Sequence, residues 1–294
     1  MLRARHLLLL RASCTAGRLP WTAAAKRVMC WWNKEVRFFS RGAAAGVDIC
    51  WYRDRYSCPP AAGPGGVSER AVFDGSPDYF VLPDASIARM ARSLGVDRVR
   101  IVALLRNPAD RFYSAYNMGM SEYKQRRSSK SDASYTEFAD SLERWIACAP
   151  DCPSEPNVVS MFFTYGMYAV HLAKYFRHFG RERVLVLKSE DFYSDSWSTV
   201  ESVLRFAWLD APQDYVDLVR PGGGGVVRRN SGAEWGKNYS GKLRPRERAS
   251  LLRFYEPHNR QLYDLVGRDF GWERDGGSVV ESNDGRPPAS RIEL

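Results

Sequence analysis

Residues 99–116 read Val-Arg-Ile-Val-Ala-Leu-Leu-Arg-Asn-Pro-Ala-Asp-Arg-Phe-Tyr-Ser-Ala-Tyr, and this stretch decides the fold of the chain. Its apolar run predicts a buried strand over 99–105 that ends at Arg106. A helix is predicted to begin at once, because Asn107 is a good N-cap and Pro108 suits the first helical position. The stretch is therefore a strand that turns sharply into a helix, with a cation at the carboxyl end of the strand.

This turn has the features of a phosphate site. In α/β sheets ligands bind at the carboxyl edge, and the N-terminus of a helix there favours an anion. Arg106 adds a planar, permanently charged donor, and Ser114, about two turns into the helix, can supply a hydroxyl. We therefore predict a phosphate site built from Arg106, Ser114 and free backbone N–H groups. The alternative is that Arg106 pairs with a surface carboxylate and that Ser114 has no special role.

The rest of the chain alternates between strands and helices. A second apolar run predicts a buried strand over 184–187, and residues 121–135 and 221–242 are predicted to be loops. Apolar periodicity predicts helices over 86–94, from 166, over 197–208 and over 245–255, with a further helix after Pro257. This alternation indicates an α/β fold with a parallel sheet flanked by helices.

The string Arg-Asn-Pro-x-x-Arg-x-x-Ser-x-Tyr at 106–116 resembles the 3′-phosphate-binding segment of sulfotransferases that use PAPS (3′-phosphoadenosine 5′-phosphosulfate). The resemblance is greatest to carbohydrate enzymes such as the heparan sulfate N- and 3-O-sulfotransferases. Further matches in the same order lie at 34–39, 51–52, 166–172, 184–191 and 254–262. The resemblance implies a sulfotransferase fold of the P-loop nucleoside triphosphate hydrolase-like class. Its domain would span 34–274, between a basic, weakly patterned segment 1–33 and a polar disordered tail 275–294.

The same resemblance implies roles for particular residues. Arg106 and Ser114 would hold the 3′-phosphate of PAPS, and Glu35, in a Lys-Glu-x-x-Phe-Phe segment, would be the catalytic base. No metal is required. Judged without the resemblance, Glu35 is an ordinary exposed carboxylate. Basic residues of the Gly-rich loop are candidates to close over the donor phosphates, although charged loops are usually just solvated: Lys237, Lys242 and Arg244.

The sequence departs from this family at three points. The family begins with a strand and a Lys-x-Gly-Thr-[Thr/Ser]-x-Leu loop that wraps the 5′-phosphosulfate, and no such string precedes Glu35. We therefore expect the fold to be N-terminally incomplete. On the acceptor side, Gly75 stands where relatives often carry lysine, and Arg37 stands where they carry histidine.

The 294-residue chain carries a formal net charge of +9, which favours acidic partners. Charge alone would also suit a nucleic-acid-binding protein, but the resemblance implies an anionic glycan acceptor and no nucleic acid. It further implies the Golgi, with membrane contact only through an N-terminal anchor that this sequence would lack. Cys148 and Cys152 form either a local disulfide or two unpaired thiols, and the lack of a nearby histidine argues against zinc.

The expected function is transfer of a sulfuryl group from PAPS to a hydroxyl or amine of a carbohydrate. The alternative, from a different functional class, is an impaired or inactive paralogue that binds nucleotide or anionic glycan without sulfation.

Overall fold

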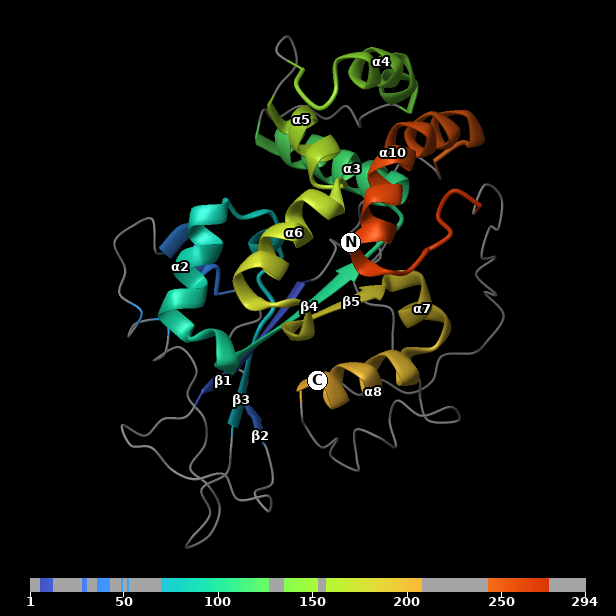
Figure 1. Ribbon diagram of the computed structural model, residues 1–294. Coiled ribbons are helices and arrows are strands. Elements are labelled where there is room, and N and C mark those ends of the chain that lie inside the picture. The colour runs from blue at the N-terminus through green and yellow to red at the C-terminus, as the bar shows by residue number, and fades with distance from the viewer. Residues whose placement is uncertain are drawn as a thin grey trace, which may run out of the picture.

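Five strands form one sheet in the order β2-β3-β1-β4-β5, and helices cover it on both sides (Figure 1). The computed structural model describes residues 6–12, 28–30, 36–42, 49, 52, 70–126, 135–152, 157–207 and 243–274. The strands are β1 (His6–Ala12), β2 (Val28–Cys30), β3 (Arg70–Asp74), β4 (Val99–Leu105) and β5 (Val184–Lys188).

Most of the α-helices follow β4 and β5 in the chain. The α-helices are α2 (Asp84–Leu94), α3 (Pro108–Arg126), α4 (Tyr135–Cys148), α5 (Asn157–Thr164), α6 (Tyr168–Phe179), α7 (Ser189–Ser194), α8 (Ser196–Ala207) and α10 (Pro245–Val266). Shorter helical turns are η1 (Phe38–Gly42), η3 (Pro77–Val81), η4 (Val96–Arg98) and η5 (Arg181–Arg183). In Figure 1, α2 and α6 lie on one side of the sheet and α8 lies on the other.

The predicted strand–helix unit is confirmed. β4 ends at Leu105, and α3 begins at Pro108 with Asn107 as its cap. β4 and β5 are parallel, as are β2 and β3, so the predicted α/β class with parallel strands is confirmed. β5 is the edge strand beside β4, and only Val184 in it is fully buried.

The central strand β1 departs from the prediction. It comes from the segment 1–33, where no strand was predicted, and it lies between β3 and β4. It runs antiparallel to both neighbours, with Leu8 opposite Asp74 on one side and Ile101 on the other. The sheet is therefore mixed. β1 begins at the edge of the sheet where β3 and β4 end, and it ends at the opposite edge.

Two helix boundaries differ from the prediction. α3 continues to Arg126, so residues 121–126 are helical and not part of a loop. α10 is one helix through Pro257 where we predicted an interruption. A proline inside a helix removes one hydrogen bond, but Tyr255 and Leu262 are buried on either side of it, and this packing holds the helix together.

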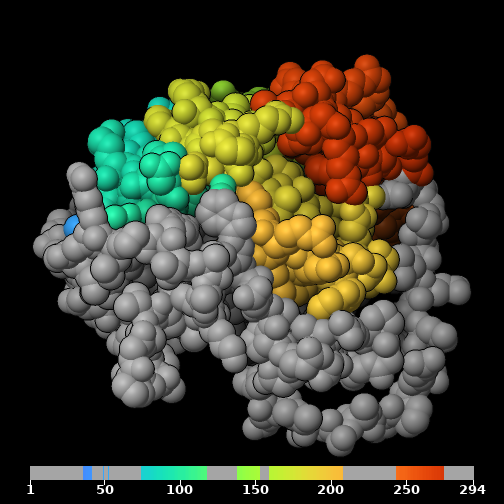
Figure 2. All heavy atoms as spheres, turned by 60° about the horizontal axis from the view of Figure 1, so that its bottom comes forward, coloured from blue at the N-terminus to red at the C-terminus, as the bar shows by residue number. Residues whose placement is uncertain are grey.

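The buried side chains form two cores. The first lies between the sheet and helices α2 and α6, and it includes Ile87, Leu105 and Trp272. The second, beyond the carboxyl end of β4, joins α3, α4, α5 and α10 around Phe112 and Phe163. Figure 2 shows α2, α6 and α10 side by side along one face of the molecule. The turn that follows β4 therefore lies where the two cores meet.

One close contact fixes the junction between α5, α6 and α10. The Tyr255 hydroxyl donates to the carbonyl oxygens of Phe162 (3.2 Å) and Phe163 (3.1 Å). Its ring lies so near Gly166 that a β-carbon added there would be 2.7 Å from the ring atom Cε1. Only glycine fits at residue 166 with α10 in this position.

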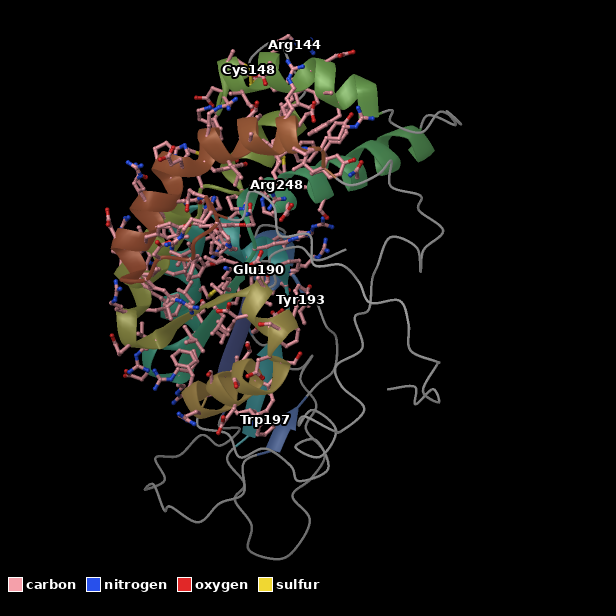
Figure 3. All side chains as sticks on the ribbon, turned by 90° about the vertical axis from the view of Figure 1, so that its right-hand side faces the viewer. Arg144, Cys148, Glu190, Tyr193, Trp197 and Arg248 are labelled. Carbon is pink, nitrogen blue, oxygen red and sulfur yellow. A yellow bond between two sulfur atoms is a disulfide. The ribbon has the colours of Figure 1, made fainter. Side chains whose placement is uncertain are left out.

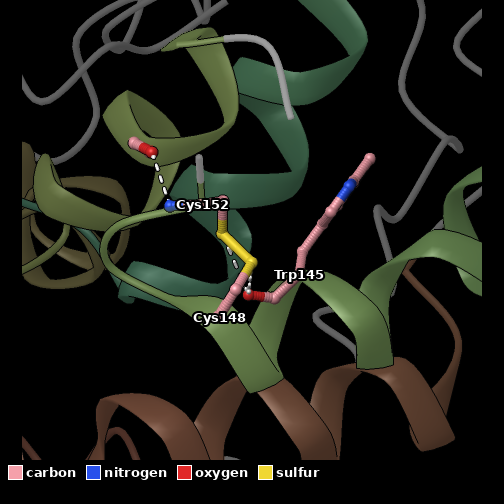
Figure 4. Close-up of a disulfide and its surroundings, with 4 residues drawn as sticks. Trp145, Cys148 and Cys152 are labelled. Atoms are coloured by element: carbon pink, nitrogen blue, oxygen red, sulfur yellow. Dashed lines mark hydrogen bonds between the residues drawn. A yellow bond between two sulfur atoms is a disulfide. The ribbon is translucent and has the colours of Figure 1, made fainter. Parts of the chain in front are cut away.

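The end of α4 is cross-linked to the loop that precedes α5. Cys148 and Cys152 form a disulfide with a Cα–Cα distance of 5.0 Å, which resolves the two alternatives for this pair (Figure 4). The Cys152 N–H also donates to Ser160 Oγ (3.3 Å), which ties the loop to α5. Within the described ranges, no helix is both long and apolar enough to cross a bilayer.

Candidate functional site

The carboxyl edge of the sheet gathers the ends of β3, β4 and β5. β4 and β5 are in register there, with Leu105 opposite Lys188, so the residues that follow each strand are neighbours. Figure 3 shows Glu190 at this edge, with Arg248 of α10 beyond it. The predicted phosphate site therefore lies where three strands end and three helices, α3, α7 and α10, meet.

Arg106 follows β4 directly, and its side chain is half-buried. Its main chain is anchored, because the Tyr168 hydroxyl donates to the Arg106 carbonyl oxygen (2.8 Å). Burial raises the pKa of Tyr168, which keeps this phenol protonated as a donor. The guanidinium forms no hydrogen bond or ion pair with any residue in the described part of the chain. The alternative pairing with a carboxylate is thus not seen there.

The amino end of α3 differs in part from the prediction, because two of its N–H groups are already bonded. The Asn107 N–H donates to Glu190 Oε1 (2.9 Å), and the Ala109 N–H donates to Asn107 Oδ1 (3.0 Å). Pro108 has no N–H to offer. A buried helix end must satisfy its donors within the protein, and here a carboxylate and the cap residue do so. A phosphate at this site would bind to side chains more than to the backbone.

Ser114 lies on α3 six residues after Pro108, which places it about 9 Å farther along the helix axis. Its side chain is half-buried, and its hydroxyl has no partner among the residues that the structure describes. Asp110 lies one turn earlier on the same face of α3. The side chains of Arg106 and Ser114 could therefore each bind a ligand, although no hydrogen bond links them to each other.

Asp110 connects this face of α3 to the start of α10. Arg248 binds it with both guanidinium nitrogens, Nη1 to Oδ1 and Nη2 to Oδ2 (3.2 Å for the second). Both side chains are largely shielded from solvent. Arg248 lies in the first turn of α10, which begins at Pro245 with Arg244 as its N-cap residue. The first turn of α10, which follows the basic loop 221–242 in the chain, therefore lies next to the predicted phosphate site.

Three of the predicted site residues lie outside the described residues: Glu35, Lys237 and Lys242. Their roles stay predictions. The two residues after Glu35 are described, and they lead into η1. Among the described residues there is no group of three or more His, Cys, Asp or Glu side chains that could hold a metal ion.

Sequence reasoning missed a buried polar network at the end of β3. Asp74 is fully buried, and its Oδ1 accepts the N–H (3.0 Å) and the hydroxyl (2.6 Å) of Ser76. Its Oδ2 accepts the Tyr52 hydroxyl (3.0 Å). Ser76 Oγ in turn accepts the N–H of Arg37 (2.8 Å). The string Asp-Gly-Ser directly after a strand is the signal that was available, because such residues form side-chain-bonded turns.

Two charged residues behind the β4 turn were also missed. Glu190 accepts the Asn107 N–H through Oε1 and the indole N–H of Trp272 through Oε2 (3.4 Å). Arg111 is buried, and it donates to the Phe162 carbonyl oxygen. Nearby Tyr255 has its pKa raised to about 12 by burial, although Arg111 opposes the shift. These residues hold the turn in place; Arg111 is buried, and Glu190 is half-buried.

Comparison with known proteins gives three kinds of match. Residues 76–220, which include Arg106 and Ser114, match the sulfotransferase domain family. The chain is 25% identical over 250 residues to heparan sulfate glucosamine 3-O-sulfotransferase 3B1 of Mus musculus, covering 81% of this chain and 57% of that protein. It is 22% identical over 244 residues to the bifunctional heparan sulfate N-deacetylase/N-sulfotransferase 2 of Bos taurus, covering 80% and 26%.

A solved structure, the sulfotransferase from Alicyclobacillus acidocaldarius, matches with a TM-score of 0.54 at 21% identity, covering 85% of this chain and 89% of that one. This likeness shows the fold. The chain spans little more than half the length of the mouse relative. Together the domain match, the curated relatives and the fold show that residues 76–220 belong to the sulfotransferase domain family, with the β4 turn inside this matched domain.

Proposed function

We propose that this protein transfers a sulfuryl group from PAPS to a hydroxyl or amine of a carbohydrate, with Arg106 and Ser114 holding the 3′-phosphate of the donor. The observation that carries the proposal is the half-buried guanidinium at the end of β4, which no carboxylate of the described residues neutralises. A permanent fork of donors at the end of β4, with a hydroxyl farther along α3, fits a phosphate dianion.

The donor supplies an activated sulfuryl group, and the chain supplies binding and proton transfer. The acceptor oxygen or nitrogen forms a new bond to sulfur while the bond from sulfur to the bridging oxygen breaks. The acceptor's proton goes to the Glu35 carboxylate, and the electron pair of the broken bond stays with the 5′-phosphate. A positioned base of this kind contributes about 10²–10⁴-fold to the rate.

The donor contacts proposed for Lys237 and Lys242 follow from where their loop ends. α10 begins at Pro245, three residues after Lys242, and Arg248 holds its first turn against α3. A cation within a few residues of that point is within reach of the β4 turn, since each residue spans at most about 3.5 Å.

The proposed acceptor is an anionic glycan, as the names of the relatives and the net charge of +9 both favour. The proposed compartment is the Golgi lumen. The Cys148–Cys152 disulfide supports this choice, because disulfides persist in the oxidising secretory pathway and are rare in the cytosol.

Calorimetric titration with 3′,5′-adenosine bisphosphate tests the donor site. Arg106→Ala is expected to weaken binding about 10–100-fold, the effect of losing charge-assisted hydrogen bonds. Arg98→Ala, at an exposed arginine in η4 before β4, is the matched control and is expected to bind like wild type. Equal affinity in Arg106→Ala and wild type would refute the proposal.

One observation favours the second candidate, a protein that binds the nucleotide without transferring sulfate. β1 is antiparallel to β4, so the residues that follow it leave at the edge opposite Arg106. A phosphosulfate loop after β1 would then be on the wrong side of the sheet. Loss of such a donor typically costs about 10²–10³ in rate. Labelled PAPS decides between the two: bisphosphate binding without label transfer to heparan-type acceptors supports the binder.

A further inference from the structure

Two carboxylates border the turn that carries Arg106, and both are already bonded. Glu190 accepts hydrogen bonds from other groups of the protein through each of its oxygens. Asp110 accepts both terminal guanidinium nitrogens of Arg248. A carboxylate shielded from water needs such partners. Arg106 has no ion pair within the described part of the chain, and this depends on the partners that its two acidic neighbours have elsewhere.

Asp110 lies between the two side chains that are proposed to hold the phosphate. Arg106 directly precedes the cap residue of α3, Asp110 is in its first turn, and Ser114 comes one turn later. The Arg111 N–H donates to the Asn107 carbonyl oxygen (2.9 Å), so the first turn of α3 closes over the end of β4. Side chains four residues apart on a helix are neighbours, with about 5–6 Å between their β-carbons. A charged Asp110 would therefore repel an anion that bridges Arg106 and Ser114.

The helix itself favours a carboxylate at residue 110. The first turn of a helix carries a partial positive charge, which an acidic side chain stabilises. A carboxylate without a partner at this place would also attract Arg106 across the turn. A bidentate pair between these two side chains would then take the guanidinium away from the ligand.

Arg248 prevents that pairing from the first turn of α10 (Figure 3). Its Nη1 binds Oδ1 of Asp110 and its Nη2 binds Oδ2 (3.2 Å for the second), so both carboxylate oxygens are occupied. The same end of α10 is also bonded to α4, because the Ser250 hydroxyl donates to Glu143 Oε1 (2.7 Å). The partner of Asp110 is thus held in place by the packing of α10 and not by the ion pair alone.

We propose that Arg248 keeps the donor site open. By binding Asp110, it leaves the Arg106 guanidinium free for the 3′-phosphate and cancels the negative charge beside it. Arg248 is a positioning residue, because it acts through Asp110 and Arg106 without a contact of its own to the ligand. The inference rests on the proposed function only for the identity of the anion.

Arg248→Gln tests this role, because it leaves Asp110 charged and able to pair with Arg106. Affinity for 3′,5′-adenosine bisphosphate, measured by calorimetric titration, is expected to fall about tenfold, the effect of losing the charge-assisted hydrogen bonds of Arg106. Adenosine 5′-monophosphate lacks the 3′-phosphate, so it should bind to wild type and to the variant alike.

A second substitution separates this role from a merely structural one. Asp110→Asn in the Arg248→Gln background removes the carboxylate that would capture Arg106, so affinity should return to within about twofold of wild type. Asp110→Asn alone should bind the bisphosphate at least as tightly as wild type, because it removes a negative charge near the phosphate. If the pair only anchored α10, the double variant would bind as weakly as Arg248→Gln.

Arg205→Gln on α8 is the matched control, because it also breaks an arginine–carboxylate pair, with Glu201 (3.2 Å), on an exposed surface. It should bind the bisphosphate like wild type. Urea unfolding of every variant checks that each is folded under the conditions of the titration. A folding defect would lower affinity in the double variant too, since it lacks the same link between α3 and α10.

The inference is overturned if Arg248→Gln binds the bisphosphate like wild type, or if the double variant binds it no better than Arg248→Gln. Wild type that does not bind the bisphosphate overturns the inference together with the donor site. Labelled PAPS decides the proposed function separately. Rescue by Asp110→Asn in a protein that transfers no label refutes the transferase and leaves the inference standing. Label transfer by wild type, with wild-type affinity in Arg248→Gln, refutes the inference alone.

Discussion

The turns after β4 and β3 lie on one edge of the sheet, but they are built in different ways. After β4, the Asn107 side chain caps the helix that it begins, so the essential residues are adjacent in sequence. After β3, Asp74 and Ser76 hold Tyr52 and Arg37, which are 22 and 39 residues away from them in the chain. The first turn is mostly local, and the second is assembled from distant segments.

We therefore expect the β4 turn to contribute mainly to ligand binding and the β3 turn mainly to the stability of the fold. The guanidinium that projects from the β4 turn has no described partner, so its loss should affect a ligand more than the fold. The carboxylate at the β3 turn is fully buried and bonded, so its loss should affect the fold first. The following predictions test this division.

Asp74→Ala is expected to have the largest effect. It leaves the Ser76 and Tyr52 donors buried without an acceptor, which should lower the free energy of unfolding by about 3 kcal/mol or more. Urea unfolding measures the loss. Asp97→Ala, at an aspartate with an exposed ion pair to Arg183, should cost less than about 1 kcal/mol. Equal losses in the two variants would remove the distinction between the turns.

His171 tests the contact between the two regions, because it packs against Phe80 of the β3 turn and faces Arg111 of α3. Burial lowers its pKa to about 4, with Lys174 and Arg111 acting in the same direction and the Thr164 carbonyl opposing. Below pH 6.5 His171 becomes protonated in the unfolded chain, whereas in the folded chain it stays neutral until about pH 4. The free energy of unfolding should therefore fall between these pH values, by on the order of 3 kcal/mol.

The measurement is the free energy of unfolding against pH for wild type and His171→Gln. The slope between pH 6.5 and 4 should be shallower in the variant by up to one proton, and no difference in slope is expected above pH 7. Parallel curves across the whole range would show that His171 does not stay neutral in the fold.

Glu190→Gln tests the contribution of α7, which is distant in sequence, to the β4 turn. It weakens the hydrogen bonds to Asn107 and Trp272, and the loss should be about 1–2 kcal/mol in unfolding free energy. Because Asn107 adjoins Arg106, affinity for 3′,5′-adenosine bisphosphate should fall as well. Glu201→Gln on the exposed face of α8 is the control. A variant with normal stability and normal affinity would show that the β4 turn needs no support from α7.

The smallest effect is expected for the Asp110–Arg248 pair. A double-mutant cycle with Asp110→Asn and Arg248→Gln should give a coupling of about 1 kcal/mol, because the pair is largely shielded and bidentate. The exposed Glu201–Arg205 pair should give about 0.3–0.5 kcal/mol. Coupling at or below that of the exposed pair would mean that α10 is held to α3 by packing alone.

The sequence was sufficient wherever the signal was local. An apolar run, a cap residue and a proline placed β4 and α3 correctly, and α2 ends at Leu94 as predicted, just before Gly95 with its φ of 80°. It was insufficient where packing decides. Pro257 indicated a break, but buried neighbours keep α10 continuous, and nothing in the pattern of residues 6–12 indicated a central strand that runs against its neighbours.

The candidate site divides in the same way. Arg106 and Ser114 were predicted because they lie in one short motif, and in the structure both side chains are half-buried without a partner among the described residues. One of the N–H groups that were expected to be free beside them is not, because the Asn107 N–H donates to Glu190, which lies in α7, 83 residues later. The hydrogen bond between Asn107 and Glu190 depends on the register in which β4 and β5 pair. That register cannot be read from either strand's sequence alone.

The contact between Gly166 and the Tyr255 ring has a consequence for ligand affinity far from it. A methyl group at residue 166 would act as a wedge that pushes the middle of α10 outward. Because α10 is continuous from Pro245 to Val266, that push would move its first turn, which follows the basic loop, away from Asp110 and Arg106. The absence of a side chain at Gly166 thus leaves the room that α10 needs to lie against α3 beside Arg106.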